Sequence, residues 1–104
     1  MLTQKPFNSY RIEYGITNPS GKDLARIDFL LGETKVGQAL FGDAIAPGAL
    51  AALTNDGEVH LFFPLPHFHN IMELLGTHAG LSLFVEVDET PERLVSRGGI
   101  MTHA

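Results

Sequence analysis

Residues 9–17 have the sequence SYRIEYGIT, and this stretch decides the expected fold. Its apolar and its polar or small side chains alternate, with Tyr10, Ile12, Tyr14 and Ile16 in one set and Arg11, Glu13 and Gly15 in the other. A period of two is typical of a β-strand that buries one face. We therefore predict a strand from Ser9 to Thr17.

Two further strands are expected after this one. The segment Asn18-Pro19-Ser20-Gly21 predicts a turn, because proline fixes φ and glycine accepts a positive φ. A strand is then expected over about Leu24–Leu31. The segment Gly32-Glu33-Thr34 predicts a second turn into a strand over about Lys35–Phe41. The three strands together predict an antiparallel meander.

The rest of the chain predicts two strands and three short helices. The strands are expected over Val59–Phe63 and Leu81–Val87. One helix is expected over residues 46–53, which are rich in alanine and leucine, and another over residues 90–97, where Pro91 fits the first turn. A third helix is predicted by apolar residues spaced i, i+3, i+4, i+7, namely Phe68, Ile71, Met72 and Leu75.

This order of elements predicts an α+β fold. We expect a two-layer sandwich, in which two or three short helices pack on one face of a mostly antiparallel sheet. The 104 residues are enough for a single domain. Residues 99–104 are expected to form a loose tail.

The charge distribution argues against nucleic acid as a partner. The net charge is −5, and no lysine or arginine occurs between Lys35 and Arg93. Nucleic-acid affinity depends on several cationic side chains that neutralise phosphates. The apolar stretch from Val59 to Val85 contains prolines and glycines that would break a spanning helix, so no membrane association is expected. Since the N-terminus lacks the apolar segment of a signal peptide, we expect a cytoplasmic protein.

Motifs that would name an enzyme class are missing from the sequence. It contains no cysteine, which excludes a thiolate nucleophile, and no glycine-rich phosphate loop or His-Glu-x-x-His motif. The segment Gly80-Leu81-Ser82 lacks the second glycine of a nucleophile elbow. These absences favour a non-enzymatic protein, and no catalytic residue is assigned.

A histidine cluster is the one group of side chains that could hold a metal. His67 and His69 could bind one transition metal if their segment is extended, because residues i and i+2 of an extended chain point the same way. If the helix already includes Pro66, the two rings point apart; if Asn70 is the N-cap, they do not. Glu73, three residues after Asn70, favours the second alternative. His60 or a carboxylate would be the third ligand.

Two classes of function remain open. We favour a small protein that acts through self-association or through a protein partner, because its apolar content is high and its charged fraction is 18% against a typical ~25%. Tyr10 and Tyr14 share a face with Ile12, which predicts packing in a core or an interface. The expected assembly is a two-fold homodimer. The alternative is a metal- or ligand-dependent protein, enzymes included, that uses the histidines of residues 60–69.

Overall fold

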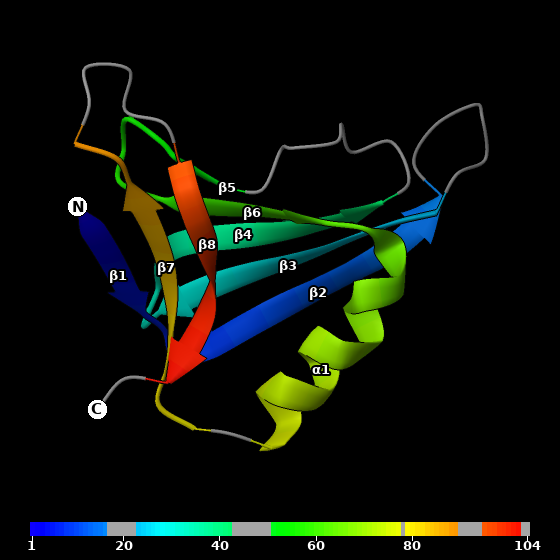
Figure 1. Ribbon diagram of the computed structural model, residues 1–104. Helices are drawn as coiled ribbons and strands as arrows, with labels where there is room; N and C mark the ends of the chain where they lie inside the picture. Colours follow the sequence, from blue (N-terminus) through cyan, green and yellow to red (C-terminus); the bar gives the residue numbers. More distant parts are fainter. Residues whose placement is uncertain (17–22, 43–50, 78, 90–94, 103–104) are drawn as a thin grey trace.

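The computed structural model describes residues 1–16, 23–42, 51–77, 79–89 and 95–102. Their strands form two separate sheets, and one helical segment follows β6 (Figure 1). The strands are β1 (Leu2–Pro6), β2 (Ser9–Ile16), β3 (Asp23–Leu31), β4 (Thr34–Gly42), β5 (Ala51–Leu53), β6 (Val59–Phe63), β7 (Leu81–Val87) and β8 (Val95–Thr102). The helical segment consists of the 3-10 turn η1 (Leu65–His67) and the helix α1 (Phe68–Thr77).

The larger sheet has five strands in the order β2-β3-β4-β6-β5. The meander predicted from the sequence is confirmed, since β2 pairs antiparallel with β3 and β3 antiparallel with β4. The turn between β3 and β4 has Gly32 at a φ of 65°, which favours glycine. The backbone N–H of Gly32 also donates to the side-chain oxygen of Asn8, at 3.1 Å. The turn expected at residues 18–21 lies outside the described residues. The pairing of β4 with β6 is parallel.

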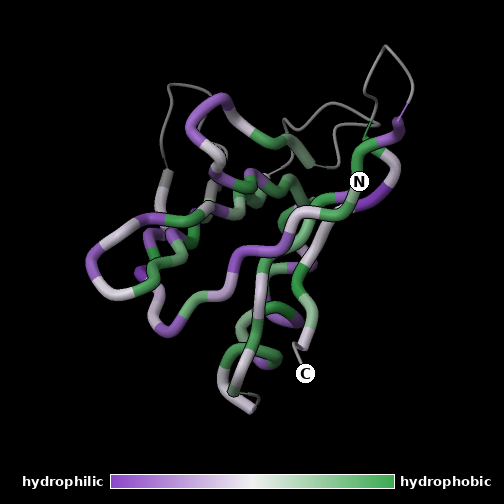
Figure 2. The backbone as a smooth tube through the Cα atoms, turned by 90° about the vertical axis from the view of Figure 1, so that its left-hand side faces the viewer, coloured by the Kyte–Doolittle hydropathy of each residue, from purple (hydrophilic) through white to green (hydrophobic). Residues whose placement is uncertain are grey.

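The smaller sheet has three antiparallel strands in the order β1-β7-β8. Figure 1 shows these strands running across the strands of the larger sheet. Figure 2 shows several of the hydrophilic stretches at the outer bends of the chain. The prediction that Leu81–Val87 is a central strand is confirmed, although it is the centre of a second sheet that the sequence did not indicate.

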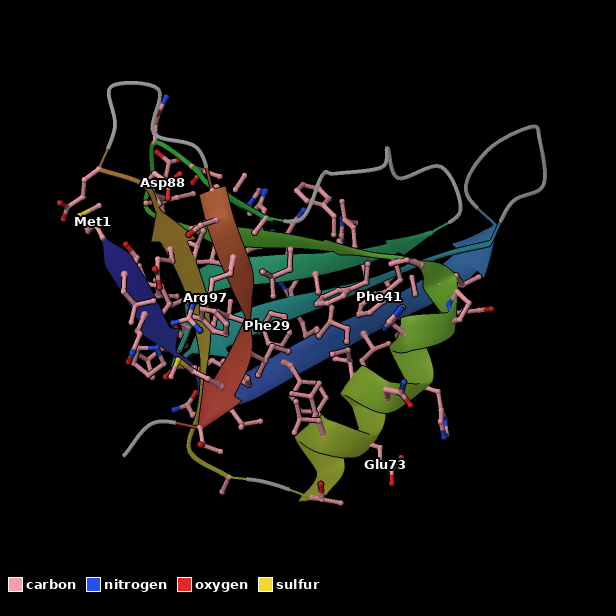
Figure 3. All side chains as sticks on the ribbon, viewed as in Figure 1. Met1, Phe29, Phe41, Glu73, Asp88 and Arg97 are labelled. Carbon is pink, nitrogen blue, oxygen red and sulfur yellow. The ribbon has the colours of Figure 1, made fainter. Side chains whose placement is uncertain are left out.

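The hydrophobic core lies between the two sheets and α1. The rings of Phe29 and Phe41 point from the larger sheet into this space (Figure 3) and are fully buried. Phe29 contacts Phe7 with 4.7 Å between ring centroids, and Phe41 contacts Phe68 at the start of α1 with 5.2 Å. The smaller sheet covers part of the core face, and α1 covers the region near β2 and β3. Glu73 points away from both sheets, on the outer side of α1 (Figure 3).

The prediction of an α+β sandwich with two or three helices on one face is wrong. The described residues are mostly strand, with one helical segment and two sheets. Of the helix expected over residues 46–53, Ala51–Leu53 form strand β5, and the rest lies outside the described residues. Of the helix expected over residues 90–97, Val95–Arg97 begin β8, and the structure does not describe the rest.

Tertiary pairing explains these differences. β5 pairs with β6, and β8 pairs with β7, so a neighbouring strand supplies the hydrogen-bond partners of each. A helix propensity of a few tenths of a kcal/mol per residue does not outweigh such pairing. The expected loose tail is also wrong for Gly99 to Thr102, because they belong to β8. The helix predicted around Ile71 and Leu75 is confirmed as α1.

Candidate functional site

Strand β2 leaves one edge of the hydrophobic core open. It is the edge strand of the larger sheet, and its residues Tyr10, Ile12 and Tyr14 lie opposite the buried residues of β3. These three side chains therefore belong to the core face, yet they are 37%, 45% and 55% exposed. Over the other strands of the larger sheet, the smaller sheet and α1 cover the same face. A row of large apolar side chains thus lies along a strand edge that α1 covers only in part, through the contact of Phe68 with Tyr14.

The opposite face of the same sheet carries a row of polar side chains. The register places Arg11 of β2 beside Asp28 of β3, then Gln38 of β4, then His60 of β6. Glu13 of β2 lies beside Arg26 of β3 in the next row. The two faces of β2 therefore differ sharply, one apolar and one charged.

Asp28 is the buried centre of this polar face. Its side chain is 10% exposed, although it lies on the face away from the core. The Nε of Arg26 and the Nζ of Lys35 are each 3.4 Å from its Oδ1, and the Nη2 of Arg11 is 3.8 Å from its Oδ2. Within the described part of the chain, Oδ1 accepts no hydrogen bond of good geometry. Charge attraction from three cations therefore holds this carboxylate.

The substitution Asp28→Asn tests this arrangement. We expect the free energy of unfolding to fall by about 1–2 kcal/mol, because three cations lose the charge that they surround. The loss stays below the 3–5 kcal/mol of fully buried pairs, since all three cations reach water. The measurement is urea denaturation. The control is Glu13→Gln, which breaks an exposed pair and should cost at most about 1 kcal/mol. Equal losses in the two variants would contradict the central role of Asp28.

The network continues to His60, the third residue of the predicted metal site. Lys35 lies 4.0 Å from Glu58, and Nε2 of His60 lies 3.2 Å from the same carboxylate oxygen. A cavity of about 260 Å³ lies over the other end of the network, beside Arg11 and Asp28. Its lining contains two arginines and two carboxylates, so it favours neither sign of ligand. The positive and negative side chains of this network balance one another. The network therefore accounts for the stability of the sheet and does not indicate a reaction.

The structure separates the other two predicted ligands from His60. Because side chains alternate along β6, His60 and Phe63 lie on opposite faces of the sheet, and the ring of His67 lies 6.3 Å from that of Phe63. His69 lies in α1. Among the described residues, no group of three or more histidine, cysteine or acidic side chains is spaced to hold a metal ion.

The helix start decides the alternative that the sequence left open. The chain is already helical from Leu65, with Pro66 inside η1, and α1 begins at Phe68. Asn70 is therefore inside the helix, and the N-cap prediction is wrong. Because His67 and His69 are two residues apart in a helical segment, their side chains point in different directions. The metal site stays a prediction that this geometry does not support.

A cavity of about 480 Å³ adjoins the open edge of β2. Its lining includes Phe7, Tyr10, Leu31 and Leu75, so it lies between the turn that joins β3 to β4 and the end of α1. The lining is mainly apolar. The cavity therefore extends the exposed apolar surface of β2 towards α1.

The sequence indicated part of this surface. It predicted that Tyr10 and Tyr14 share a face with Ile12, and the register confirms this. It did not predict the charge cluster around Asp28. A sequence signal for the cluster exists, since Arg11 and Glu13 lie two residues apart in one strand and Arg26 and Asp28 two residues apart in the next. Opposite charges face each other only in the observed register, so the signal can be recognised only when that register is known.

Comparison with known proteins gives no further guide. No protein-family model, curated protein or solved structure matches the chain significantly. None of the helices in the described ranges has the length and apolar character needed to span a lipid bilayer. The function is therefore inferred from the geometry of the chain itself.

Proposed function

We propose that the protein is a non-enzymatic binding protein whose β2 edge accepts a strand of another polypeptide chain. The observation that supports this is the exposure of Tyr10, Ile12 and Tyr14 on the open edge of the core face. An added strand would bond to the outward-facing backbone groups of the edge and cover the apolar row. Tyrosine suits such a surface, because its ring buries a large apolar area while its hydroxyl stays near water.

The other strand edges carry features that discourage pairing. β1 is five residues long and contains Lys5 and Pro6. β5 has only three residues. β8 has consecutive glycines at 98 and 99, which weaken a strand. Lysine, proline and short length are the common means of protecting an edge. β2 has eight residues and no proline, so it is the edge best suited to accept a strand.

A polypeptide is the partner that the charges favour. Residues 36–92 carry no lysine or arginine, which disfavours nucleic acid. The metal-dependent alternative finds no support in the placement of His60 and His67, and we do not propose it as a second function. The cytoplasm stays the predicted compartment.

A labelled strand peptide tests the proposal. The probe has the length of β2 and alternates apolar with charged residues. We expect saturable binding in fluorescence anisotropy, because the edge supplies both hydrogen bonds and apolar contacts. The control peptide has the same composition but a central proline, which cannot continue the ladder, and should not bind. Equal signals from the two peptides, or none from either at a protein concentration at which the chain is monomeric, would contradict strand addition.

A further inference from the structure

We infer that the strand accepted by β2 is the β2 strand of a second copy, paired antiparallel about Ile12. This inference rests on the proposed function of β2. The sequence of the strand is complementary to its own reverse. In this register Ile12 lies opposite Ile12 of the second copy, Arg11 opposite Glu13 of the second copy, and Tyr10 opposite Tyr14 of the second copy. Each pair is favourable across an antiparallel ladder.

The two faces of the sheet are preserved in this pairing. A two-fold axis perpendicular to the sheet reverses the direction of the strand and keeps its core face on the same side. Tyr10, Ile12 and Tyr14 therefore meet their counterparts on the core face, and the charged residues meet on the polar face. Apolar side chains that are 37–55% exposed would cover one another.

The charged residues of β2 are available for contacts across the edge. The side chain of Arg11 is 71% exposed, and its approach to Asp28 is long, at 3.8 Å. Glu13 accepts from Arg26 through Oε2 at 3.0 Å, and its side chain is 69% exposed. A carboxylate has a second oxygen and further lone pairs, so Glu13 can also accept from Arg11 of the second copy. The pairing would form two such ion pairs.

Other registers are unfavourable. Centring the pair on Arg11 places two arginines opposite each other, and centring it on Glu13 places two glutamates opposite each other. A shift of one residue places apolar side chains opposite charged ones. Among the registers centred on Arg11, Ile12 or Glu13, the pattern therefore favours the one about Ile12.

The helices leave room for this assembly at their N-terminal ends. Phe68 contacts Phe41 on β4 and Tyr14 on β2, so α1 begins beneath β3, one strand in from the edge. With strands about 4.8 Å apart, the two copies of β3 would be about 14 Å apart. Packed helices need about 8–10 Å.

The overall charge also favours contact at this edge. Each copy carries −5, so two copies repel. The first 35 residues contain five cations and four carboxylates, whereas the excess acid lies in residues 36–92. Because each copy has one β2 and the pairing is two-fold, the assembly closes as a dimer.

A single cysteine tests the register. The chain contains no cysteine, so Ile12→Cys introduces the only thiol. Residues directly opposite in an antiparallel pair have Cα atoms about 4.5–5.5 Å apart, which suits a disulfide. We expect Ile12→Cys to cross-link fully under mild oxidation. Tyr10→Cys should not, because its two copies would be four residues out of register, about 14 Å apart. A mixture of Tyr10→Cys and Tyr14→Cys should cross-link.

Charge reversal provides the second test. Arg11→Glu and Glu13→Arg each place like charges opposite each other in a homodimer, so each variant alone should have the monomer mass of 11.3 kDa by light scattering. Mixing the two restores both ion pairs, and we expect a heterodimer of twice that mass. Any destabilisation within one copy is present before mixing, so each variant is its own control.

The outcomes separate this inference from the proposed function. A dimeric parent, the disulfide formed by Ile12→Cys and the heterodimer together support the inference. A parent that stays at 11.3 kDa at every concentration but binds the strand peptide overturns the inference and leaves the proposed function intact. An assembling parent whose Ile12→Cys variant does not cross-link, and whose charge variants form no heterodimer, overturns the register. A monomeric parent that binds no strand peptide overturns both.

Discussion

Replacing Ile12 with lysine is expected to abolish association and to leave the protein folded. In the dimer about Ile12, two lysines would lie opposite each other at the centre of the interface. Loss of a central contact typically costs about 2–4 kcal/mol, or roughly 30- to 1,000-fold in the dissociation constant. Folding should persist, because Ile12 is 45% exposed in the single chain. Light scattering measures the mass, and circular dichroism checks the fold.

The matched control for this substitution is Leu2→Lys. Leu2 is 42% exposed and also lies on an edge strand, β1 of the smaller sheet. Since β1 is short and contains Lys5 and Pro6, it should take no part in association. The Leu2→Lys protein should keep the mass of the parent. An unchanged mass for Ile12→Lys, or an equal loss in both variants, would exclude β2 as the association surface.

The strands that the sequence predicted are those with a local signal. The alternation around Ile12 and the turn at Gly32 need only neighbouring residues, and β2, β3 and β4 follow the expected ranges closely. The stripe of Ile71 and Leu75 likewise defines α1 from its own spacing. A hydrophobic period is a property of the segment itself, so one sequence is enough to find it.

The elements that the sequence missed depend on pairing with other strands rather than on a pattern of their own. Ala51 favours a helix by propensity, yet in β5 its small side chain lies close to Gly98 of β8, where an added Cβ would meet it. β8 was expected to be part helix and part tail, because its sequence has no clear alternation of apolar and polar residues and its strand depends on pairing with β7. The division into two sheets follows from these pairings and cannot be derived from the period of either segment.

In the candidate site, too, some features follow from a local sequence pattern and others depend on the whole fold. The sequence grouped Tyr10, Ile12 and Tyr14 on one face, but their importance depends on β2 being an edge strand, which is a property of the whole sheet. The histidine prediction depended on a helix start, and the start at Phe68 placed His69 inside α1. A sequence places the ends of a helix only to within a few residues. A site that depends on one helix start therefore changes when that start moves by two residues.

Replacing Gly37 with alanine is expected to destabilise the fold strongly. Gly37 lies on β4, where the two sheets approach each other. An added Cβ would collide with the backbone oxygen of Val59 on β6 and with a methyl group of Leu83 on β7. Both neighbours are fully buried, and a backbone oxygen cannot rotate away. We expect a loss of about 3 kcal/mol, the upper end of the usual range for overpacked cores.

Thermal and urea unfolding of the parent, of Gly37→Ala and of a control variant measures this loss of stability. For a chain of this size, a loss of about 3 kcal/mol lowers Tm by more than roughly 10 °C. The control is Gly76→Ala, because Gly76 lies in α1 with nothing within 4 Å of an added Cβ. That change should stabilise the protein by about 0.5–1 kcal/mol, since alanine favours a helix over glycine. If Gly37→Ala unfolds at the temperature of the parent, the sheets do not approach each other at Gly37 as closely as the structure describes, because only that approach makes a single methyl group costly.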